Sequence, residues 1–270
     1  MASDAAAGDL AVRLSDDHDL VRVQPFLAGV PCSIHGLALQ DATVALRPCE
    51  TLMLLDPAAH TFQYARTATY WDPSLEHRIA IHETVRKVGD ALRTMVDYRG
   101  VFTLDGVMTA NGFRPTEVNP RFGAALPARL PTADGRMLPL FFTHLAAVVG
   151  ELDDFDTDKL EALLIDRLDA NRAGSGFIRS DRGPTGGEEV TVQLTGDWTQ
   201  DRWSAVRLAG ANDEPFATAT WGTDPQGGLI FCSFTDGMRI GPPAALTLVE
   251  VRRFLNEHWD LGLAEFVTAC

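Results

Sequence analysis

Apolar residues form short runs in some parts of the chain and helical stripes in others, so strands and helices are both expected. Three short apolar runs predict strands, at residues 32–39, 44–46 and 52–55. Apolar side chains then recur every three or four residues from Ile81 to Met95. This is the spacing of an amphipathic helix of about five or six turns. Asp72 and Pro73 fit the N-cap and the first position of that helix.

The segment from residue 100 to residue 123 reads GVFTLDGVMTANGFRPTEVNPRFG and predicts a β-hairpin. Its two apolar runs lie at residues 101–105 and 113–118. Asn111-Gly112 stands between them, and this dipeptide is typical of the tight turn that joins antiparallel strands.

The rest of the chain continues the same mixture. We expect helices at residues 138–149, 159–171 and 246–259. We expect strands at residues 190–194, 203–208, 217–221 and 229–234. Residues 173–188 are rich in glycine and are expected to form a linker or an exposed loop.

These elements together predict an α+β protein that has an antiparallel sheet with flanking helices, followed by a small C-terminal α+β unit. The expected division is an N-terminal extension at residues 1–20, a main unit at 21–172, a linker at 173–189 and the small unit at 190–270.

Composition excludes several classes of function. The formal net charge of −14 gives no basic footprint for nucleic acid or for an anionic membrane surface. No apolar run reaches the 18 to 20 or so residues of a membrane span, and the first ten residues lack the features of a secretory signal. The four cysteines show no paired spacing, which favours reduced, buried thiols and a cytoplasmic protein.

Candidate chemistry lies on the predicted hairpin. Glu117 and Asn119 are two residues apart on one strand, so their side chains leave the same face. Asp105 ends the preceding strand, and antiparallel pairing can bring it to the same patch. Two carboxylates and an amide oxygen are ligands suited to Mg²⁺ or Mn²⁺. Arg121 would emerge on the same side after Pro120 and could bind a phosphate or an acyl phosphate. The alternative is that these residues are only the solvent side of a two-stranded ribbon.

The hairpin resembles the C-terminal half of the ATP-grasp fold. The resemblance rests on GVFTLD followed, after a turn, by EVNPR. It implies that Asp105, Glu117 and Asn119 hold the magnesium ions that bridge the phosphates of ATP. It also implies that Arg121 steadies the phosphoryl or acyl group that reacts.

The segment VRVQPFLAGVPCSIHG resembles the interdomain strand and hinge of the same family, whose backbone meets the edge of adenine. In this chain the matching residues are Gln24, Pro25, Phe26 and Leu27. Gln24 replaces the glutamate of many members, which keeps an acceptor and loses a charge. Ser33 and His35 fall where contacts with ribose or substrate are often found, although His35 also fits a histidine packed in the core.

The chain departs from the family in its cationic residues. Lys87 and Lys159 are its only lysines, and neither is placed to replace the lysines that the N-terminal domain and the lid of the family supply. Arg47 is therefore a second candidate for contact with the nucleotide, or else forms an ion pair at the end of a strand. The departure leaves three interpretations open: an upstream segment supplies the lid over ATP, a partner supplies it, or the domain has lost catalysis.

The function implied by the resemblance is that of a ligase, in which ATP and Mg²⁺ convert a carboxylate into an acyl phosphate. An amine, a thiol or another nucleophile then attacks the acyl phosphate. The alternative is a binding or interaction module derived from the same fold without catalysis, or a truncated fragment that needs a partner for the lid. The small-molecule carboxylate and the nucleophile are not identified by the sequence.

Overall fold

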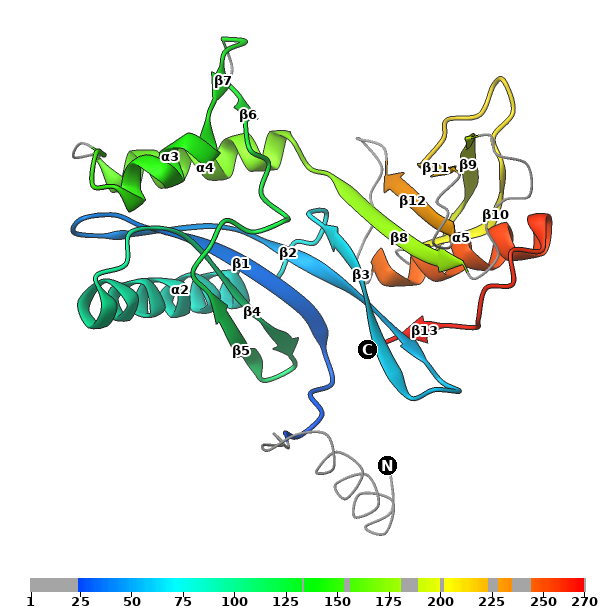
Figure 1. Ribbon diagram of the computed structural model, residues 1–270, viewed down its shortest axis with the longest axis horizontal. Coiled ribbons are helices and arrows are strands. Elements are labelled where there is room, and N and C mark those ends of the chain that lie inside the picture. The colour runs from blue at the N-terminus through cyan, green and yellow to red at the C-terminus, as the bar shows by residue number, and fades with distance from the viewer. Residues whose placement is uncertain are drawn as a thin grey trace.

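The computed structural model describes residues 24–132, 134–152, 156–180, 189–199, 202–222, 228–234 and 244–269. The extension expected at residues 1–20 lies outside these ranges. Eleven strands form one sheet, in which ten follow the order β10-β9-β11-β12-β8-β3-β2-β1-β4-β5 and β13 also pairs with β2 (Figure 1).

The strands of the N-terminal half of the sheet are β1 (Val30–Ala38), β2 (Thr43–Asp56), β3 (Thr61–Ala68), β4 (Gly100–Thr109) and β5 (Gly112–Asn119). Those of the other half are β8 (Gly174–Ser180), β9 (Val190–Thr199), β10 (Arg202–Leu208), β11 (Ala217–Trp221), β12 (Gly228–Phe234) and β13 (Val267–Thr268). A separate ribbon contains β6 (Leu130–Pro131) and β7 (Met137–Leu138). The described helices are α2 (Leu75–Val96), α3 (Leu140–Val148), α4 (Thr157–Ala170) and α5 (Ala244–Trp259).

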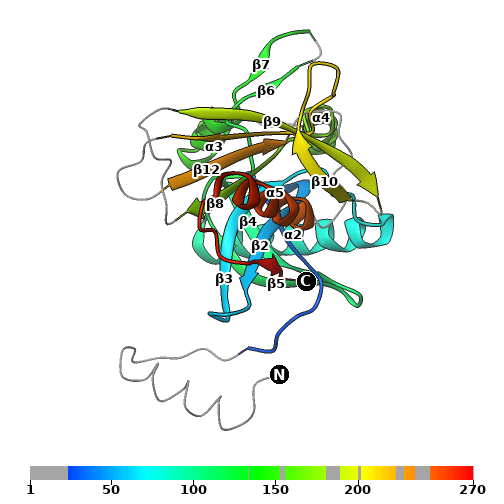
Figure 2. The same ribbon diagram turned by 90° about the vertical axis from the view of Figure 1, so that its right-hand side faces the viewer.

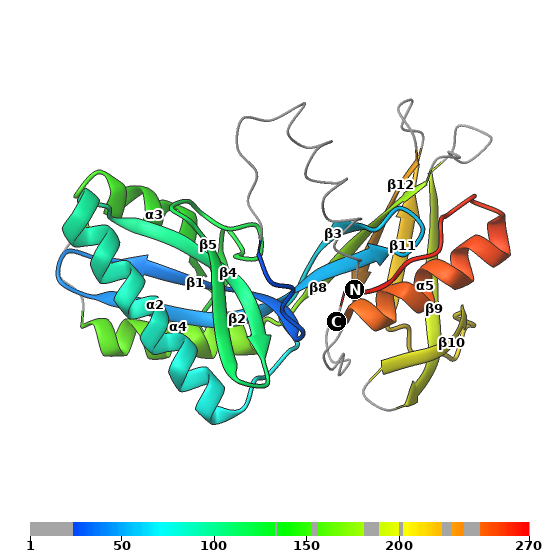
Figure 3. The same ribbon diagram turned by 90° about the horizontal axis from the view of Figure 1, so that it is seen from below.

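Helices cover both faces of the N-terminal part of the sheet. In Figure 3, α2 lies on one face of β1, β2 and β4, and α3 and α4 lie on the other. The C-terminal strands are covered by α5 (Figure 2), which packs against β10 and also reaches β2. Each layer has its own apolar core, one under α2, one under α3 and α4, and one under α5. The expected α+β class is confirmed.

The alternation of side chains along β1 and β4 creates the two faces on which the site depends. Ile34, Phe102 and Leu104 point toward α2 and are completely or almost completely buried. Their neighbours along the strands, which include Ser33 and Asp105, point to the opposite face. The register pairs Ser33 directly with Asp105, so the polar residues of the two strands lie side by side.

The prediction of two strands at residues 44–46 and 52–55 is wrong, because one continuous strand, β2, covers both. Pro48 lies in the middle of this strand and cannot donate a ladder hydrogen bond. It pairs with Ile34, where the register between β1 and β2 shifts before Gly36. This irregularity accommodates the proline.

Two further expectations need correction in the neighbourhood of β2. The strand β3 was not predicted, because within it only Ala65 and Ala68 are buried and the apolar signal is weak. The helix α2 begins two residues later than expected. Its N-cap is Ser74, whose side chain accepts a hydrogen bond from the backbone N–H of His77. Met95 is 81% exposed, so the apolar stripe ends before the helix does.

The expected linker is wrong for residues 174–180, which form β8 between β3 and β12. The glycines of β8 allow neighbouring side chains to pack closely against its backbone. A Cβ at Gly176 would lie 2.9 Å from the side chain of Leu248, and one at Gly174 would lie 2.8 Å from the ring of Phe234. The rest of the expected linker, residues 181–188, lies outside the described residues. The sheet runs across the expected boundary, and the division into folding units stays a prediction.

Most of the remaining local predictions agree with the structure. Two do not: β4 continues to Thr109 instead of ending at Asp105, and Leu138, expected in a helix, lies in β7. The hairpin of β4 and β5 turns at Ala110-Asn111, between the paired residues Thr109 and Gly112, and Gly112 has a φ of 95°, a conformation that favours glycine. The strands expected after residue 190 are β9, β10, β11 and β12, and the closing helix is α5. Within the described ranges, no helix combines the length and the apolar character that crossing a membrane would require.

Candidate active site

A cavity of about 680 Å³ opens over the exposed side of β1, β3, β4 and β5. One end is apolar and the other is polar. The apolar end is lined by Pro25, Phe26, Leu27, Pro31, Met53, Phe62, Tyr64 and Val107. The polar end is lined by Ser33, His35, Thr51, Thr103, Asp105, Thr116, Glu117, Asn119 and Arg121. A cavity of this size and mixed lining is typical of small-molecule sites.

The structure brings Asp105, Glu117 and Asn119 together at the polar end. Asp105 and Glu117 are paired in register across β4 and β5. The side-chain amide of Asn119 donates a hydrogen bond of 2.8 Å from Nδ2 to Oδ2 of Asp105. That bond leaves the Asn119 Oδ1 atom available to a ligand. Asp105 and Asn119 are half-buried, whereas Glu117 is exposed.

These three residues could hold a hard divalent cation. Carboxylate and amide oxygens suit Mg²⁺, which keeps several waters and is usually bound by one or two carboxylates together with phosphate oxygens. In the part of the chain that the structure describes, no group of three His, Cys, Asp or Glu residues is placed to hold a metal ion. Two carboxylates and one amide oxygen leave further coordination positions for phosphate oxygens and waters, so the donor set fits a cation that shares its coordination with a phosphate ligand.

Arg121 brings a positive charge to the same end of the cavity. Its backbone N–H donates to the carbonyl of Asn119 at 2.8 Å, which makes a tight turn around Pro120. The guanidinium is exposed, with one long contact of 3.5 Å from Nη1 to the carbonyl of Phe122. Among the described residues that line the cavity it is the only Lys or Arg, and neither Lys87 nor Lys159 takes part.

The apolar end is built from the segment before β1 and from β3. The rings of Phe26 and Phe62 stack with centroids 6.3 Å apart and an angle of 12° between their planes. Both rings are more than half exposed, at 69% and 51%. Gln24 is exposed and does not line the cavity, unlike Pro25 and Leu27. Phe62 and Tyr64 were missed by sequence reasoning because β3 was not predicted.

The floor of the polar end contains a buried histidine. His35 is only 2% exposed, and its burial, together with the nearby charge of Arg121, lowers its pKa to about 4. The ring is therefore neutral at physiological pH. Beside it, the buried Oγ1 atom of Thr103 has no hydrogen-bond partner among the described residues. Such an orphaned group is typical of a site that receives a ligand or water.

Gly123 allows the loop that carries Arg121 to pack closely against His35 and Thr103. A Cβ at residue 123 would lie 2.1 Å from Nε2 of His35 and 2.6 Å from Oγ1 of Thr103. Both neighbours are buried and cannot swing away. Gly123→Ala is therefore expected to displace the loop and weaken ligand binding at least tenfold, with a small loss of stability. Titration calorimetry with Mg·ATP measures the loss. Gly222→Ala, outside the cavity and with no atom within 3.9 Å of the added Cβ apart from Glu189, is the matched control. Unchanged affinity would show that a Cβ at residue 123 does not displace the loop.

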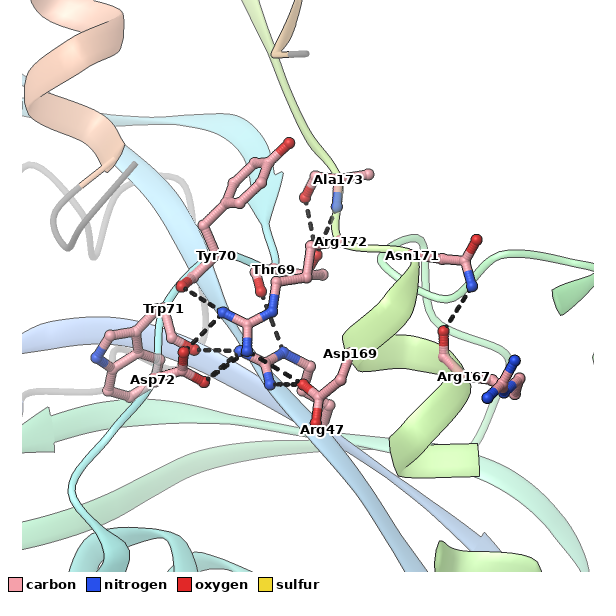
Figure 4. A network of polar contacts seen from close by, with 10 residues as sticks. All are labelled: Arg47, Thr69, Tyr70, Trp71, Asp72, Arg167, Asp169, Asn171, Arg172 and Ala173. Carbon is pink, nitrogen blue, oxygen red and sulfur yellow. Dashed lines mark hydrogen bonds and ion pairs between the residues drawn. The ribbon is translucent and has the colours of Figure 1, made fainter. Parts of the chain in front are cut away.

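Arg47 does not line the cavity. It forms ion pairs instead, which was the alternative expectation for this residue. The Arg47 guanidinium contacts the carboxylates of Asp72 and Asp169 and donates to the carbonyls of Thr69 and Trp71 (Figure 4). Arg172 pairs with the same two carboxylates. Partial burial opposes ionisation of Asp72, but hydrogen bonds from the two arginines hold its pKa below the ordinary value.

This network makes a stability prediction. The Arg47 side chain is only 5% exposed. Asp72→Asn combined with Asp169→Asn leaves its charge buried and uncompensated, which is expected to cost about 3 kcal/mol of the free energy of unfolding. Arg47→Met is expected to cost less, because the two carboxylates are partly exposed and keep Arg172. Urea unfolding measures both. A larger loss for Arg47→Met than for the double variant would contradict this account.

No protein-family model and no curated protein matches the sequence. Solved structures do resemble the chain. One is N5-carboxyaminoimidazole synthase from Aspergillus clavatus in complex with ADP and 5-aminoimidazole ribonucleotide, with 12% identity and a TM-score of 0.47 over 93% of this chain and 58% of that one. Another is L-amino acid ligase from Bacillus licheniformis, with 12% identity and a TM-score of 0.42 over 89% of this chain and 54% of that one.

A third is the biotin carboxylase domain of a single-chain bacterial carboxylase, with 17% identity and a TM-score of 0.41 over 85% of this chain and 48% of that one. The chain thus spans about half the length of the structures it resembles. The likeness is therefore to part of each of these structures.

Proposed function

We propose that this chain carries the magnesium and phosphate end of an ATP-grasp-type ligase. The observation that supports the proposal most strongly is the convergence of Asp105, Glu117 and Asn119 beside Arg121 in one cavity. Two carboxylates, an amide oxygen and a guanidinium recognise a Mg²⁺-bound phosphate group. The apolar end, with Phe26 and Phe62, offers a wall for the adenine ring.

The reaction joins a carboxylic acid to a nucleophile. The substrate carboxylate attacks the γ-phosphorus of ATP, ADP leaves, and an acyl phosphate forms. An amine or another nucleophile then attacks the acyl carbon and displaces phosphate. Asp105, Glu117 and Asn119 would hold Mg²⁺, which when bound would neutralise charge on the phosphate oxygens. Arg121 would stabilise the negative charge that develops on the transferred group.

A second candidate is a binding module of the same fold without catalysis. It is favoured by the single arginine in the cavity, because a triphosphate is usually met by several cationic side chains. Under this proposal the cavity binds a nucleotide or a divalent cation weakly, and the function lies in contact with a partner that supplies further charge.

Hydroxylamine distinguishes the two candidates because it traps acyl phosphates as stable hydroxamates. The chain is incubated with Mg·ATP, hydroxylamine and a panel of carboxylic acids, and ADP and hydroxamate are measured. The ligase predicts that both products appear together for some acids and that Asp105→Asn abolishes them. Tight Mg·ATP binding without product for any acid would favour the binding module. Absence of both binding and product would contradict the proposed nucleotide site.

A further inference from the structure

A row of side-chain hydrogen bonds crosses four adjacent strands beneath the cavity. Ser33 on β1 lies with its Oγ atom 3.0 Å from Oγ1 of Thr51 on β2. The Ser33 hydroxyl also donates to Oδ1 of Asp105 on β4. Asn119 on β5 donates to the other oxygen of the same carboxylate. Both oxygens of Asp105 are therefore engaged by protein donors.

The chemistry of the groups fixes the direction of these bonds. A carboxylate only accepts hydrogen bonds, so the single proton of the Ser33 hydroxyl goes to Asp105. Ser33 must then accept from Thr51, since its own proton is already used. The order is Thr51 to Ser33 to Asp105, with Asn119 donating from the other side. Each oxygen of Asp105 keeps a further lone pair for a ligand.

The burial of Ser33 indicates that its hydroxyl requires the hydrogen bonds to Thr51 and Asp105. The side chain lies in a position that is only 6% exposed, in a strand whose backbone is already paired on both sides. An apolar side chain would suit such a position, and a hydroxyl is favourable there only when it is hydrogen-bonded. Its two partners are Thr51 and the carboxylate at the cavity.

We propose that Ser33, supported by Thr51, is a positioning residue that fixes the orientation of the Asp105 carboxylate, and of Asn119 through it, toward a divalent cation. This inference rests on the proposed function for the identity of the cation. Removing a side chain that hydrogen-bonds to a metal ligand typically weakens metal affinity by 10- to 100-fold.

The test combines a readout without metal and a readout with metal. In ¹⁵N-HSQC spectra of the metal-free chain, Ser33→Ala is expected to shift the side-chain amide signals of Asn119, whereas Ser33→Thr keeps the hydroxyl and leaves them near their original positions. In Mn²⁺ titrations followed by electron paramagnetic resonance, Ser33→Ala is expected to weaken binding about tenfold, with substantial rescue by Ser33→Thr. Ser233→Ala, a strand serine outside the row, is the matched control.

The outcomes separate this inference from the proposed function. Unchanged Asn119 signals in Ser33→Ala would overturn the positioning role whether or not metal binds. Shifted signals with unchanged Mn²⁺ affinity would also overturn it, while the metal site would stand. Failure of the unaltered protein to bind Mn²⁺ both alone and with a non-hydrolysable ATP analogue, whose phosphates complete the coordination, would overturn the metal site itself and the role of Ser33 toward it.

Discussion

Asp105→Asn is expected to weaken the binding of Mg·ATP by about a hundredfold. The substitution removes a charged ligand of the cation, and a charge-assisted contact is worth about 1.5 to 3 kcal/mol. It also removes an acceptor, because an amide at residue 105 cannot accept from both Ser33 and Asn119. Calorimetric titration with a non-hydrolysable analogue of Mg·ATP measures the change.

Glu117→Gln is expected to have a smaller effect, about tenfold, because Glu117 is exposed and shares no hydrogen bond with the other two residues of the site. Glu214→Gln, which neutralises an exposed carboxylate outside the cavity, serves as the control. Binding of metal-free ATP in the presence of a chelator should be little changed in Asp105→Asn. If both site variants bound Mg·ATP as the unaltered protein does, the carboxylates would not be ligands of the cation.

Glu50→Gln is expected to uncover a strong pH dependence of stability that is hidden in the unaltered protein. The Glu50 carboxylate is buried and accepts hydrogen bonds from the backbone N–H groups of Ala244 and Ala245 at the start of α5. Burial raises its pKa from an ordinary 4.5 to about 7. Between these values the folded protein holds a proton that the unfolded chain has released, so the free energy of unfolding falls as pH rises.

His35 has the opposite effect over nearly the same range. Burial lowers its pKa from 6.5 to about 4, so between these values the unfolded chain holds the additional proton. The free energy of unfolding therefore rises with pH. Each group contributes about 2 kcal/mol between pH 5 and pH 6.5, and the two contributions nearly cancel.

Urea unfolding at pH 5 and pH 6.5 separates the two groups. The unaltered protein is expected to become modestly more stable at pH 6.5, because burial lowers the pKa of His82 and of His144 as well. Relative to the unaltered protein, Glu50→Gln is expected to gain about 2 kcal/mol of unfolding free energy between pH 5 and pH 6.5, and His35→Gln to lose about the same amount. Differences from the unaltered protein isolate each residue because the other groups remain. Parallel profiles for all three proteins would contradict the burial that the structure gives to Glu50 and His35.

The hairpin of the site could be predicted from the sequence because its signals are local. Asn111-Gly112 predicts the turn, but the register that starts at this turn would pair Asp105 with Thr116. A register shift between Asp105 and Gly106, which the sequence does not predict, brings Asp105 opposite Glu117. Asn119 lies on the same patch as Glu117. A spacing of two along a strand is sufficient to predict a shared face once the strand itself is correctly predicted.

The rest of the cavity could not be predicted because it depends on pairing between distant segments. The strand β3 has a weak apolar pattern, so Phe62 was not expected opposite Phe26. The role of Arg47 was left open because its partners Asp72 and Asp169 come from other elements. The glycines of β8 suggested a loop, although they permit close packing beneath α5.

Anomalous diffraction from crystals grown with Mn²⁺ and a non-hydrolysable ATP analogue would locate the cation relative to Asp105, Glu117 and Asn119. The account predicts a manganese peak within about 2.5 Å of oxygens from Asp105 and Asn119 or Glu117, with phosphate oxygens completing its coordination and Arg121 facing the terminal phosphate. A peak held by other residues, or a nucleotide bound with its phosphates away from β4 and β5, would contradict it.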